Sequence, residues 1–506
     1  MERRVARRIV VVSFVLGLLA VRLCFDLPIG LNAPILAVLI LIGACLTRPS
    51  GARFDPFDAW LPAGAVAVTL GAALRGDPVL QLADLGLAAA LIGGAVPAIA
   101  GFAITRSSAI ALAGIGVRVM TSVAIAGAPI LVAASPSPDR ASLSSGRNAV
   151  APVARGLGIA IPIVILFVAL FAGADAVFAR VAQGALHPDL RLGDLPTRGS
   201  LTIVVAWLAA GLFAMWATLL PTIEAGPIEG WPTPTAGWTP PAERPIGAGT
   251  TEAFVVLGAV DAIFALFVGL QVAYLFGGHD TLAVAGLTYS DYARRGFFEL
   301  VIVAVLAVSL VVIVDRIVGR RSRAVVGASV VLLAFTTVVL ASAFVRLRLY
   351  QDAYGWTELR FYVLTTILFL AFALVATVVL LLRDRIAWLG HALVMGGVAV
   401  VVSLAIVGPG GFIADRNLER ALHPELVPAG GRTGLDAAYL ASLGDDAIPA
   451  LVATYGRLSA TDNRLVGEAL ARRWAVLRTF PAESDPAAWN LGRARAHDAL
   501  LTLFGP

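Results

Sequence analysis

The sequence contains no lysine, so all 38 of its basic residues are arginine. Cysteine is scarce as well, because only Cys24 and Cys45 occur, each near the end of an apolar run and without metal-ligand spacing. This pattern predicts buried free thiols instead of a disulfide framework or a metal cluster. Charged residues make up 14% of the chain, against about 25% in a soluble domain. The shortage of charge excludes a soluble enzyme, a nucleic-acid-binding protein and a disordered chain.

Signatures of catalysis and cofactor binding are missing too. The chain has no G-x-S-x-G, no H-E-x-x-H, no Walker loop and no paired Cys/His cluster, and its five histidines are dispersed. An intramembrane enzyme would need a nucleophile and a base that converge in one cleft, and no such set is visible. We therefore expect no catalytic residue, no metal and no cofactor.

Long hydrophobic runs dominate what is present. Hydrophobic residues account for 59% of the chain and the mean hydropathy is +0.87. Because these are solid apolar runs and not alternating strands, they predict an all-α, polytopic transmembrane helical bundle with about 11 to 13 spans. The predicted spans are 9–25, 29–46, 58–74, 79–103, 108–135, 154–173, 200–221, 252–276, 297–314, 324–345, 360–382 and 387–408.

The distribution of arginine predicts the orientation. Arginines precede the first run at positions 3–8, and others fill the loops at 316–323 and 383–385. Cytoplasmic loops collect basic residues, so we expect a multi-pass protein of the bacterial inner membrane with a cytoplasmic N-terminus and an extracytoplasmic tail. This orientation requires an odd number of spans, whereas the runs named above are even in number. One assignment between residues 79 and 155 must be wrong.

Two segments do not read as membrane spans. Prolines and tryptophans fill residues 221–247, which predicts an extended loop within a bundle formed by residues 1–408. Charge returns in residues 409–506, where apolar residues recur at helical spacing. We expect three or four short amphipathic helices there, forming a small C-terminal domain. The predicted breaks between these helices are Pro449, Pro481 and Pro486.

Among the polar residues inside predicted spans, three stand out for their depth or their proximity to one another: Asp261, Gln271 and Arg118. An ionisable group at that depth costs several kcal/mol unless it is paired or faces water. Asp261 and Arg118 could form a pair, which would be either functional or purely structural. We take the three residues as candidates for a polar pathway.

Two junctions between spans are dense in charged and aromatic residues, and both are predicted to lie on the extracytoplasmic side of the membrane. Arginines are disfavoured there, so we expect them to pair with nearby acids in one shared cluster at the membrane surface. The alternative is an aromatic belt with arginines that extend to the interface. The candidates are Arg294, Arg295 and Glu299 in the first junction, and Arg348, Asp352, Glu358 and Arg360 in the second.

The same junctions carry a resemblance to a known family. The relevant segments are 174–179, 274–278, 288–300 and 349–360, followed in the tail by 415–417, 435–440, 445–451 and 489–495. Over roughly residues 150 to 506 the chain resembles an uncharacterised bacterial family of polytopic membrane proteins, the domain of unknown function with the number four-one-seven-three and its close relatives. The resemblance implies membrane insertion but no activity, substrate or cofactor.

Three functional hypotheses remain, and an intramembrane enzyme is the least supported of them, because the sequence shows no converging nucleophile and base. The favoured one is a transporter or permease-like protein whose pathway is lined by Asp261, Arg118 and Gln271, which requires a water-filled cavity reaching the middle of the bilayer. The alternative is an envelope signalling or assembly protein whose tail docks a protein partner, which requires a packed bundle and an exposed groove on the tail. The expected partners are the lipid bilayer and a protein at the tail, with no nucleic acid, and the sequence does not identify a small-molecule substrate.

Overall fold

The structure is a computed structural model. It describes residues 3–105, 195–224, 250–276, 297–318, 322–428, 434–478 and 485–505, with single positions between 115 and 130 and at 431. Every regular element in these described ranges is a helix, which confirms the predicted all-α class with apolar membrane helices and a small C-terminal helical domain. Residues 108–135, 154–173 and 225–249 hold two predicted spans and most of the predicted Pro-rich loop, and they fall almost entirely outside the description.

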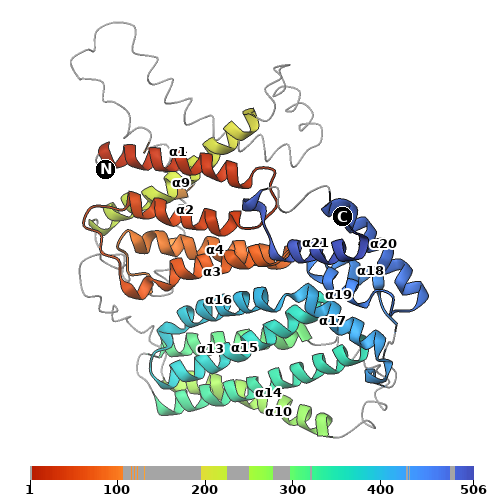
Figure 1. The fold of residues 1–506 in the computed structure, drawn as a ribbon. Helices are drawn as coiled ribbons and strands as arrows, with labels where there is room; N and C mark the ends of the chain where they lie inside the picture. Colours follow the sequence, from red (N-terminus) through yellow and green to blue (C-terminus); the bar gives the residue numbers. More distant parts are fainter. Residues whose placement is uncertain are drawn as a thin grey trace, which may run out of the picture. The chain divides into compact units, whose positions relative to one another are not determined.

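The chain divides into two compact units, of which the first contains residues 1–73, 84–241 and 485–489. Its helices are α1 (Arg3–Cys24), α2 (Asn32–Thr47), α3 (Trp60–Leu74), most of α4 (Pro78–Ile99) and α9 (Leu195–Glu224). Helix α9 packs along α1 (Figure 1). Gly17 permits this close approach, because a Cβ atom there would lie 2.5 Å from the carbonyl oxygen of Thr202.

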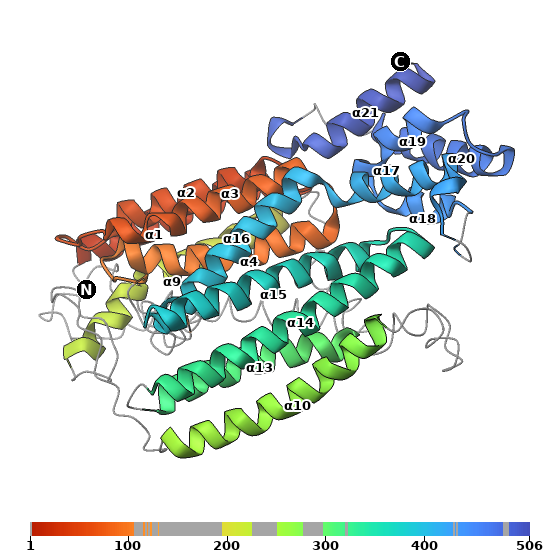
Figure 2. The same cartoon turned by 90° about the horizontal axis from the view of Figure 1, so that it is seen from below.

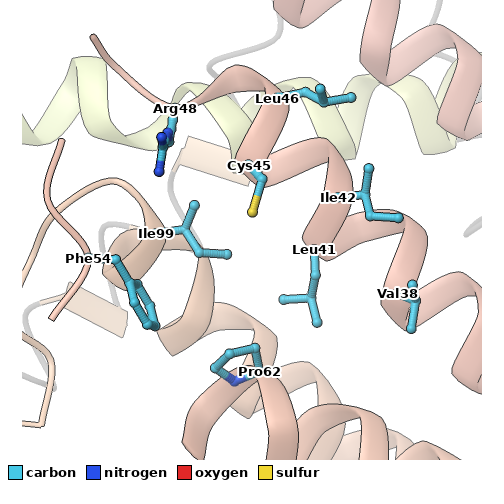
Figure 3. A pocket seen from close by; sticks show the side chains of 9 residues that line it. All are labelled: Val38, Leu41, Ile42, Cys45, Leu46, Arg48, Phe54, Pro62 and Ile99. Atoms are coloured by element: carbon cyan, nitrogen blue, oxygen red, sulfur yellow. The ribbon is translucent and has the colours of Figure 1, made fainter. Parts of the chain in front are cut away.

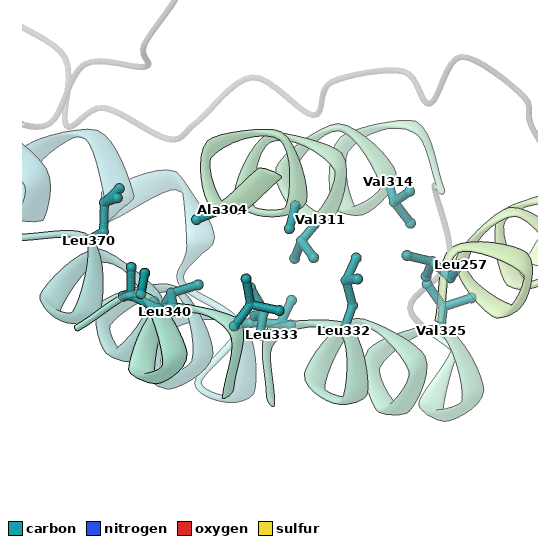
Figure 4. Close-up of a cluster of buried hydrophobic side chains, with 14 of the residues drawn as sticks. Leu257, Ala304, Val311, Val314, Val325, Leu332, Leu333, Leu340 and Leu370 are labelled. Carbon is teal, nitrogen blue, oxygen red and sulfur yellow. The ribbon is translucent and has the colours of Figure 1, made fainter. Parts of the chain in front are cut away.

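The second unit contains residues 74–83, 242–484 and 490–506. Its apolar helices are α10 (Thr250–Phe276), α13 (Phe297–Ile317), α14 (Arg323–Tyr354), α15 (Glu358–Leu382) and α16 (Leu389–Val407). Helix α14 packs against α10, α13 and α15 (Figure 2). Leu257, Val311 and Leu332 from three of these helices meet in a fully buried cluster (Figure 4).

Six helices in the described part of the chain are long and apolar enough to cross a membrane. They cover Pro56–Leu74, Pro78–Ile99, Thr197–Met215, Arg323–Tyr354, Glu358–Leu382 and Ile386–Val407. Shorter apolar helices cover Asn32–Thr47, Ala253–Gly269 and Val301–Asp315. The helices match the predicted runs closely, with one clear difference: α14 continues to Tyr354, so much of the second junction is helical.

The C-terminal helices form a small core in the second unit, and Trp356 and Phe361 from the α14–α15 turn and the start of α15 are part of it. The C-terminal helices are α17 (Pro409–Leu422), α18 (Ala437–Ser442), α19 (Ile448–Thr454), α20 (Ala460–Leu477) and α21 (Leu491–Phe504). Leu418, Leu440, Val466 and Leu500 are buried in this core. Helix α18 ends at Ser442 and α19 begins at Ile448, so the predicted break lies just before Pro449, which occupies the first turn of α19, where no backbone N–H is needed.

The prediction of buried thiols is also wrong. Cys24 and Cys45 are both free and both exposed on helix surfaces. A membrane helix presents apolar residues outward to lipid as well as inward, so an apolar flank does not imply burial in the protein.

Candidate functional site

The turn between α14 and α15 is the centre of the candidate site. Gly355 ends α14 with φ +79°, a backbone conformation that favours glycine, and its N–H donates to the carbonyl of Gln351. Thr357 then begins α15, because its hydroxyl accepts a hydrogen bond from the Arg360 backbone N–H at 3.4 Å. The second predicted junction thus becomes a tight, capped turn at the end of two membrane helices.

The C-terminal domain binds this turn through side chains that contact its backbone. The Asn417 Oδ1 accepts from the Trp356 N–H, and the Asn417 Nδ2 donates to the Trp356 carbonyl, both at 2.8 Å. The Tyr439 hydroxyl accepts from the Glu358 N–H at 2.7 Å. Gly355 lies so close to α17 that a Cβ atom there would be 2.6 Å from the Asn417 Oδ1. The domain therefore recognises the shape of this particular turn.

Two arginines complete the site, one from each side. Arg360 donates from Nη1 to the carbonyls of Tyr354 at 3.1 Å and Gly355 at 2.6 Å, and its guanidinium lies 4.1 Å from the centre of the Tyr350 ring. Arg420 donates to the carbonyls of Asp352 and Ala353 in the last turn of α14. These carbonyls carry the partial negative charge of a helix C-terminus, which holds both cations in place.

Burial lowers the pKa of Arg420, the nearby Asp352 raises it, and the positive charge of Arg360 lowers it again. The two guanidinium groups are therefore close enough to repel each other electrostatically. Burial also raises the pKa of the Tyr439 hydroxyl, which keeps it a neutral phenol at physiological pH.

A cleft of about 360 Å³ opens between these groups, and we call it the arginine cleft. This size lies within the usual range of small-molecule sites, about 300 to 1,000 Å³. Its walls combine two cations, one carboxylate (Asp436), three tyrosines and one tryptophan, and the excess of cations suits an anionic group beside a planar or apolar one. The residues that line it are Tyr350, Tyr354, Gly355, Trp356, Thr357, Arg360, Asn417, Arg420, Ala421, Gly434, Leu435, Asp436, Tyr439 and Leu440.

The candidates from the second junction do lie together at this turn. Arg348 pairs with Asp352 at 3.6 Å across one helical turn, and its guanidinium lies 5.6 Å from the Trp356 ring centre. Glu358 begins α15 and meets the domain through its backbone N–H. Of the four residues, Arg360 lines the cleft directly, whereas Arg348 supports the turn from the side of α14.

The other candidates are described less completely. Arg118, Arg294 and Arg295 lie outside the described residues, and Glu299 and Gln271 are described only as backbone positions in α13 and α10. The shared cluster of the two junctions and the pair of Asp261 with Arg118 therefore remain predictions. Asp261 itself lies in α10, and its Oδ1 is buried without a hydrogen-bond partner among the described residues.

A second arginine site was not predicted, although Asp446 belongs to the tail segment 445–451 that carries the family resemblance, and we call it the Arg75–Asp446 pair. Arg75 follows α3 and donates to the carbonyls of Ala405 at 2.5 Å and Ile406 at 2.6 Å, near the end of α16. Its Nη1 lies 3.4 Å from the Asp446 Oδ1, and the N–H of Gly76 donates to the Asp446 Oδ2 at 3.1 Å. Gly492 packs so close that a Cβ atom would lie 2.5 Å from this carboxylate.

Burial raises the pKa of Asp446, while the Gly76 N–H and Arg75 lower it. The first effect is the largest because the Asp446 side chain is only 3% exposed. The neighbouring Asp445 makes a bidentate ion pair with Arg473 at 2.6 and 2.8 Å, which holds α20 against the same segment. This region fixes the fold of the C-terminal domain and leaves little polar surface open to a ligand.

Parts of the arginine cleft did carry a sequence signal. Tyr439, Asp436 and Asn417 belong to tail segments that the family resemblance rests on, but nothing in their spacing indicates contact with a turn some sixty to eighty residues earlier. Among the described residues, no group of three or more His, Cys, Asp or Glu side chains could hold a metal ion.

Three comparisons with known proteins place the chain. A family model described as "Domain of unknown function (DUF4153)" matches residues 62–454. The expectation of a family known only as a domain of unknown function is confirmed, and the number of the matched family differs from the one that the resemblance named. The match begins before the predicted limit near residue 150 and ends before α20 and α21. Neither the comparison with curated proteins nor that with solved structures finds a match. Because the matched range covers well over half of the chain, the protein belongs to the DUF4153 family.

Proposed function

We propose that this protein is an envelope signalling or assembly protein of the bacterial inner membrane, whose C-terminal domain binds a partner in the arginine cleft. The observation that carries this proposal is the shared construction of the cleft: Arg360 comes from a membrane helix, whereas Arg420 and Tyr439 come from the C-terminal domain. A ligand in the cleft would contact both at once. Binding there could therefore be transmitted to α14 and α15, the two helices that the turn connects.

The charge of the cleft favours an anionic group on the partner. Arg360 has no ion pair within the described residues. Its hydrogen bonds to the two carbonyls come from Nη1, so the other nitrogens of the guanidinium can donate to a ligand. Arginine presents a planar fork of donors that matches a carboxylate or phosphate. Tyrosines on the same walls supply rigid surface for an adjoining apolar or planar group.

An orientation with the N-terminus in the cytoplasm and the C-terminal domain outside agrees with contacts in each unit. In the first unit, the turn after α1 meets the segment 485–489, where the Leu31 N–H donates to the Trp489 carbonyl at 3.0 Å. This turn is one helix length away from the arginines that begin α1. In the second unit, Arg323 begins α14 and Arg383 and Arg385 follow α15, so these arginines lie at the helix ends opposite the cleft. The pattern is that of basic loops inside.

A fusion experiment tests this orientation. Alkaline phosphatase placed after Pro506 should be active, and a fluorescent protein at the same point should be dark, because the phosphatase folds only outside the cytoplasm. Fluorescence without phosphatase activity would place the C-terminal domain in the cytoplasm and remove the envelope partner.

The cleft itself is tested by filling it without removing a hydrogen bond. Ala421 lines the cleft, whereas Ala438 is an exposed position of α18 that does not. In a deletion strain of the source bacterium, profiled for growth under envelope stresses, Ala421→Phe should fail to restore the wild-type profile and Ala438→Phe should restore it. Restoration by both variants at equal protein levels would contradict the proposal.

The second candidate is a transporter, and one observation favours it. The Asp261 Oδ1 is buried in the middle of an apolar helix without a described partner, and such acids commonly mark ion or proton pathways. Under this hypothesis Asp261→Leu should leave the fold intact and abolish the growth phenotype, while Ala421→Phe should not. The two variants therefore separate the two functions in one complementation assay.

A further inference from the structure

An apolar crevice of about 480 Å³ lies in the first unit. It is bordered by the last turns of α2, the loop that follows, and the facing ends of α3 and α4. Figure 3 shows Leu41, Phe54 and Ile99 around a common space, with Arg48 at one end of it. The lining residues are Val38, Leu41, Ile42, Cys45, Leu46, Arg48, Phe54, Pro62 and Ile99.

The crevice is continuous with an apolar surface of α2. Val38, Ile42 and Leu46 follow one another at intervals of one helical turn and are 39%, 49% and 54% exposed. In a chain with several membrane helices, a stripe of this kind faces acyl chains. A lipid chain lying along α2 would enter the crevice without crossing a polar barrier.

The only charged residue in the lining is Arg48, and it is not neutralised. Its guanidinium makes no hydrogen bond or ion pair within the described part of the chain, and the residue is exposed. Helix α1 begins beside it, because Arg8 donates from Nη2 to the Arg48 carbonyl at 3.0 Å. Arg4 and Arg7 are exposed in the same turns of α1. The mouth of the crevice is therefore positively charged.

Asp55 and Asp58 follow Phe54 in the chain, and both carboxylates accept hydrogen bonds from backbone N–H groups. Asp58 is fully buried, and its carboxylate accepts hydrogen bonds from the backbone N–H groups of Ile104 and Thr105 at 3.1 and 2.6 Å. Asp55 caps the short helix that follows it by accepting from the Phe57 N–H. Each acid stabilises local structure.

We propose that this crevice is a binding site for an anionic phospholipid of the surrounding leaflet. One acyl chain occupies the space between Leu41, Phe54 and Ile99, and the phosphate lies against Arg48. The site needs both parts of the ligand, because the walls are apolar and the mouth is cationic. This inference is independent of the arginine cleft and of what binds there.

The native cysteines provide the test. Cys45 lines the crevice, whereas Cys24 lies at the other end of the α1–α2 pair and is likewise exposed. The full chain is purified in detergent, depleted of lipid and alkylated with N-ethylmaleimide in a Cys24→Ser variant. Added phosphatidylglycerol should slow alkylation of Cys45 at about fivefold lower concentration than phosphatidylcholine with the same chains, the advantage that one arginine gives an anionic headgroup.

Two further variants assign the effect. Arg48→Gln should abolish the difference between the two lipids, and Arg48→Lys should retain most of it. In a Cys45→Ser variant, neither lipid should protect Cys24 preferentially. The proposal is overturned if Cys45 reacts at the same rate with and without lipid, if both lipids protect it equally, or if Cys24 shows the same lipid preference.

Discussion

Arg75 and Arg420 make the same kind of contact in two places of the second unit. Each guanidinium donates hydrogen bonds to backbone carbonyls near the end of a membrane helix. The difference lies in what else surrounds the cation. Arg75 also meets the buried carboxylate of Asp446. Arg420 instead shares the arginine cleft with a second cation, Arg360, which has no ion pair within the described residues. We therefore interpret the Arg75 site, where a buried carboxylate pairs with the cation, as structural. We interpret the Arg420 site, where a second arginine lies nearby, as a recognition surface.

The sharpest way to break this comparison is to remove one arginine from each site. Arg75→Gln should lower the free energy of unfolding by about 3 kcal/mol, because it leaves a buried carboxylate unpaired. Arg360→Gln should cost about 1 kcal/mol, because only hydrogen bonds to carbonyls are lost. Unfolding midpoints in the same detergent would measure both. Equal losses would mean that Arg360 is as structural as Arg75.

The next test separates the charge of Asp446 from its role as a hydrogen-bond acceptor. Asp446→Ala should destabilise the protein by about 2 kcal/mol, because the Gly76 N–H and Arg75 both lose their acceptor. Asp446→Asn retains an acceptor and should cost about half as much, consistent with a site whose burial already raises the pKa of the carboxyl group. Protease sensitivity of residues 409–506 would report the same order. A costlier Asn variant would show that the negative charge itself is required.

A smaller effect is expected at the turn beneath the arginine cleft. Gly355 and Gly456 both have positive φ, at +79° and +86°, but only Gly355 faces a close neighbour, Asn417. Replacing either glycine with alanine should cost about 1 kcal/mol for the backbone. Gly355→Ala should cost roughly 1 kcal/mol more, because Asn417 must move and weaken its bonds to Trp356. Equal costs in thermal unfolding would mean that α17 does not recognise the turn.

The smallest expected effect is a pH dependence of opposite sign at two acids. The Ala487 N–H and Arg22 lower the pKa of Asp485, so its contribution is present above the ordinary pKa and is lost as pH falls through the lowered value. Burial raises the pKa of Asp446, so its contribution is present below the ordinary pKa and is lost as pH rises through the raised value.

Asn variants at both positions measure this difference between about pH 3 and about pH 6. The destabilisation by Asp485→Asn should disappear at the lower pH, and that by Asp446→Asn should increase there. Parallel changes in the two variants would contradict the assigned causes.

The membrane helices could be predicted because a span needs an unbroken apolar run, as in α15 and α16, and that requirement is local. The second junction was identified from its charge and aromatic density, but its shape was not, since α14 continues as a helix through Tyr354. The Arg75–Asp446 pair joins residues 371 positions apart, and neither residue is unusual in its own segment. Contacts of this kind depend on how the elements pack, which periodicity does not encode.

The contribution of the C-terminal domain to the arginine cleft could not be predicted from the sequence for the same reason. Arg420 and Asn417 occupy one face of α17 and read as ordinary surface residues of an amphipathic helix. Both side chains contact the turn at the end of α14, which is formed by a distant segment of the chain. Arg360 was found because it lies in a junction dense in charged and aromatic residues, on the side of the membrane where arginine is disfavoured.

The most direct test of the central claim, that the arginine cleft binds a partner, is photo-crosslinking in living cells. A photoreactive amino acid at position 421 lies in the cleft, and the same residue at position 438 lies on an exposed face of the same domain. The account predicts a discrete adduct from position 421 that is lost when Arg360→Gln is added, and no such adduct from position 438. Identical adducts from both positions, or an adduct at 421 that persists without Arg360, would contradict it.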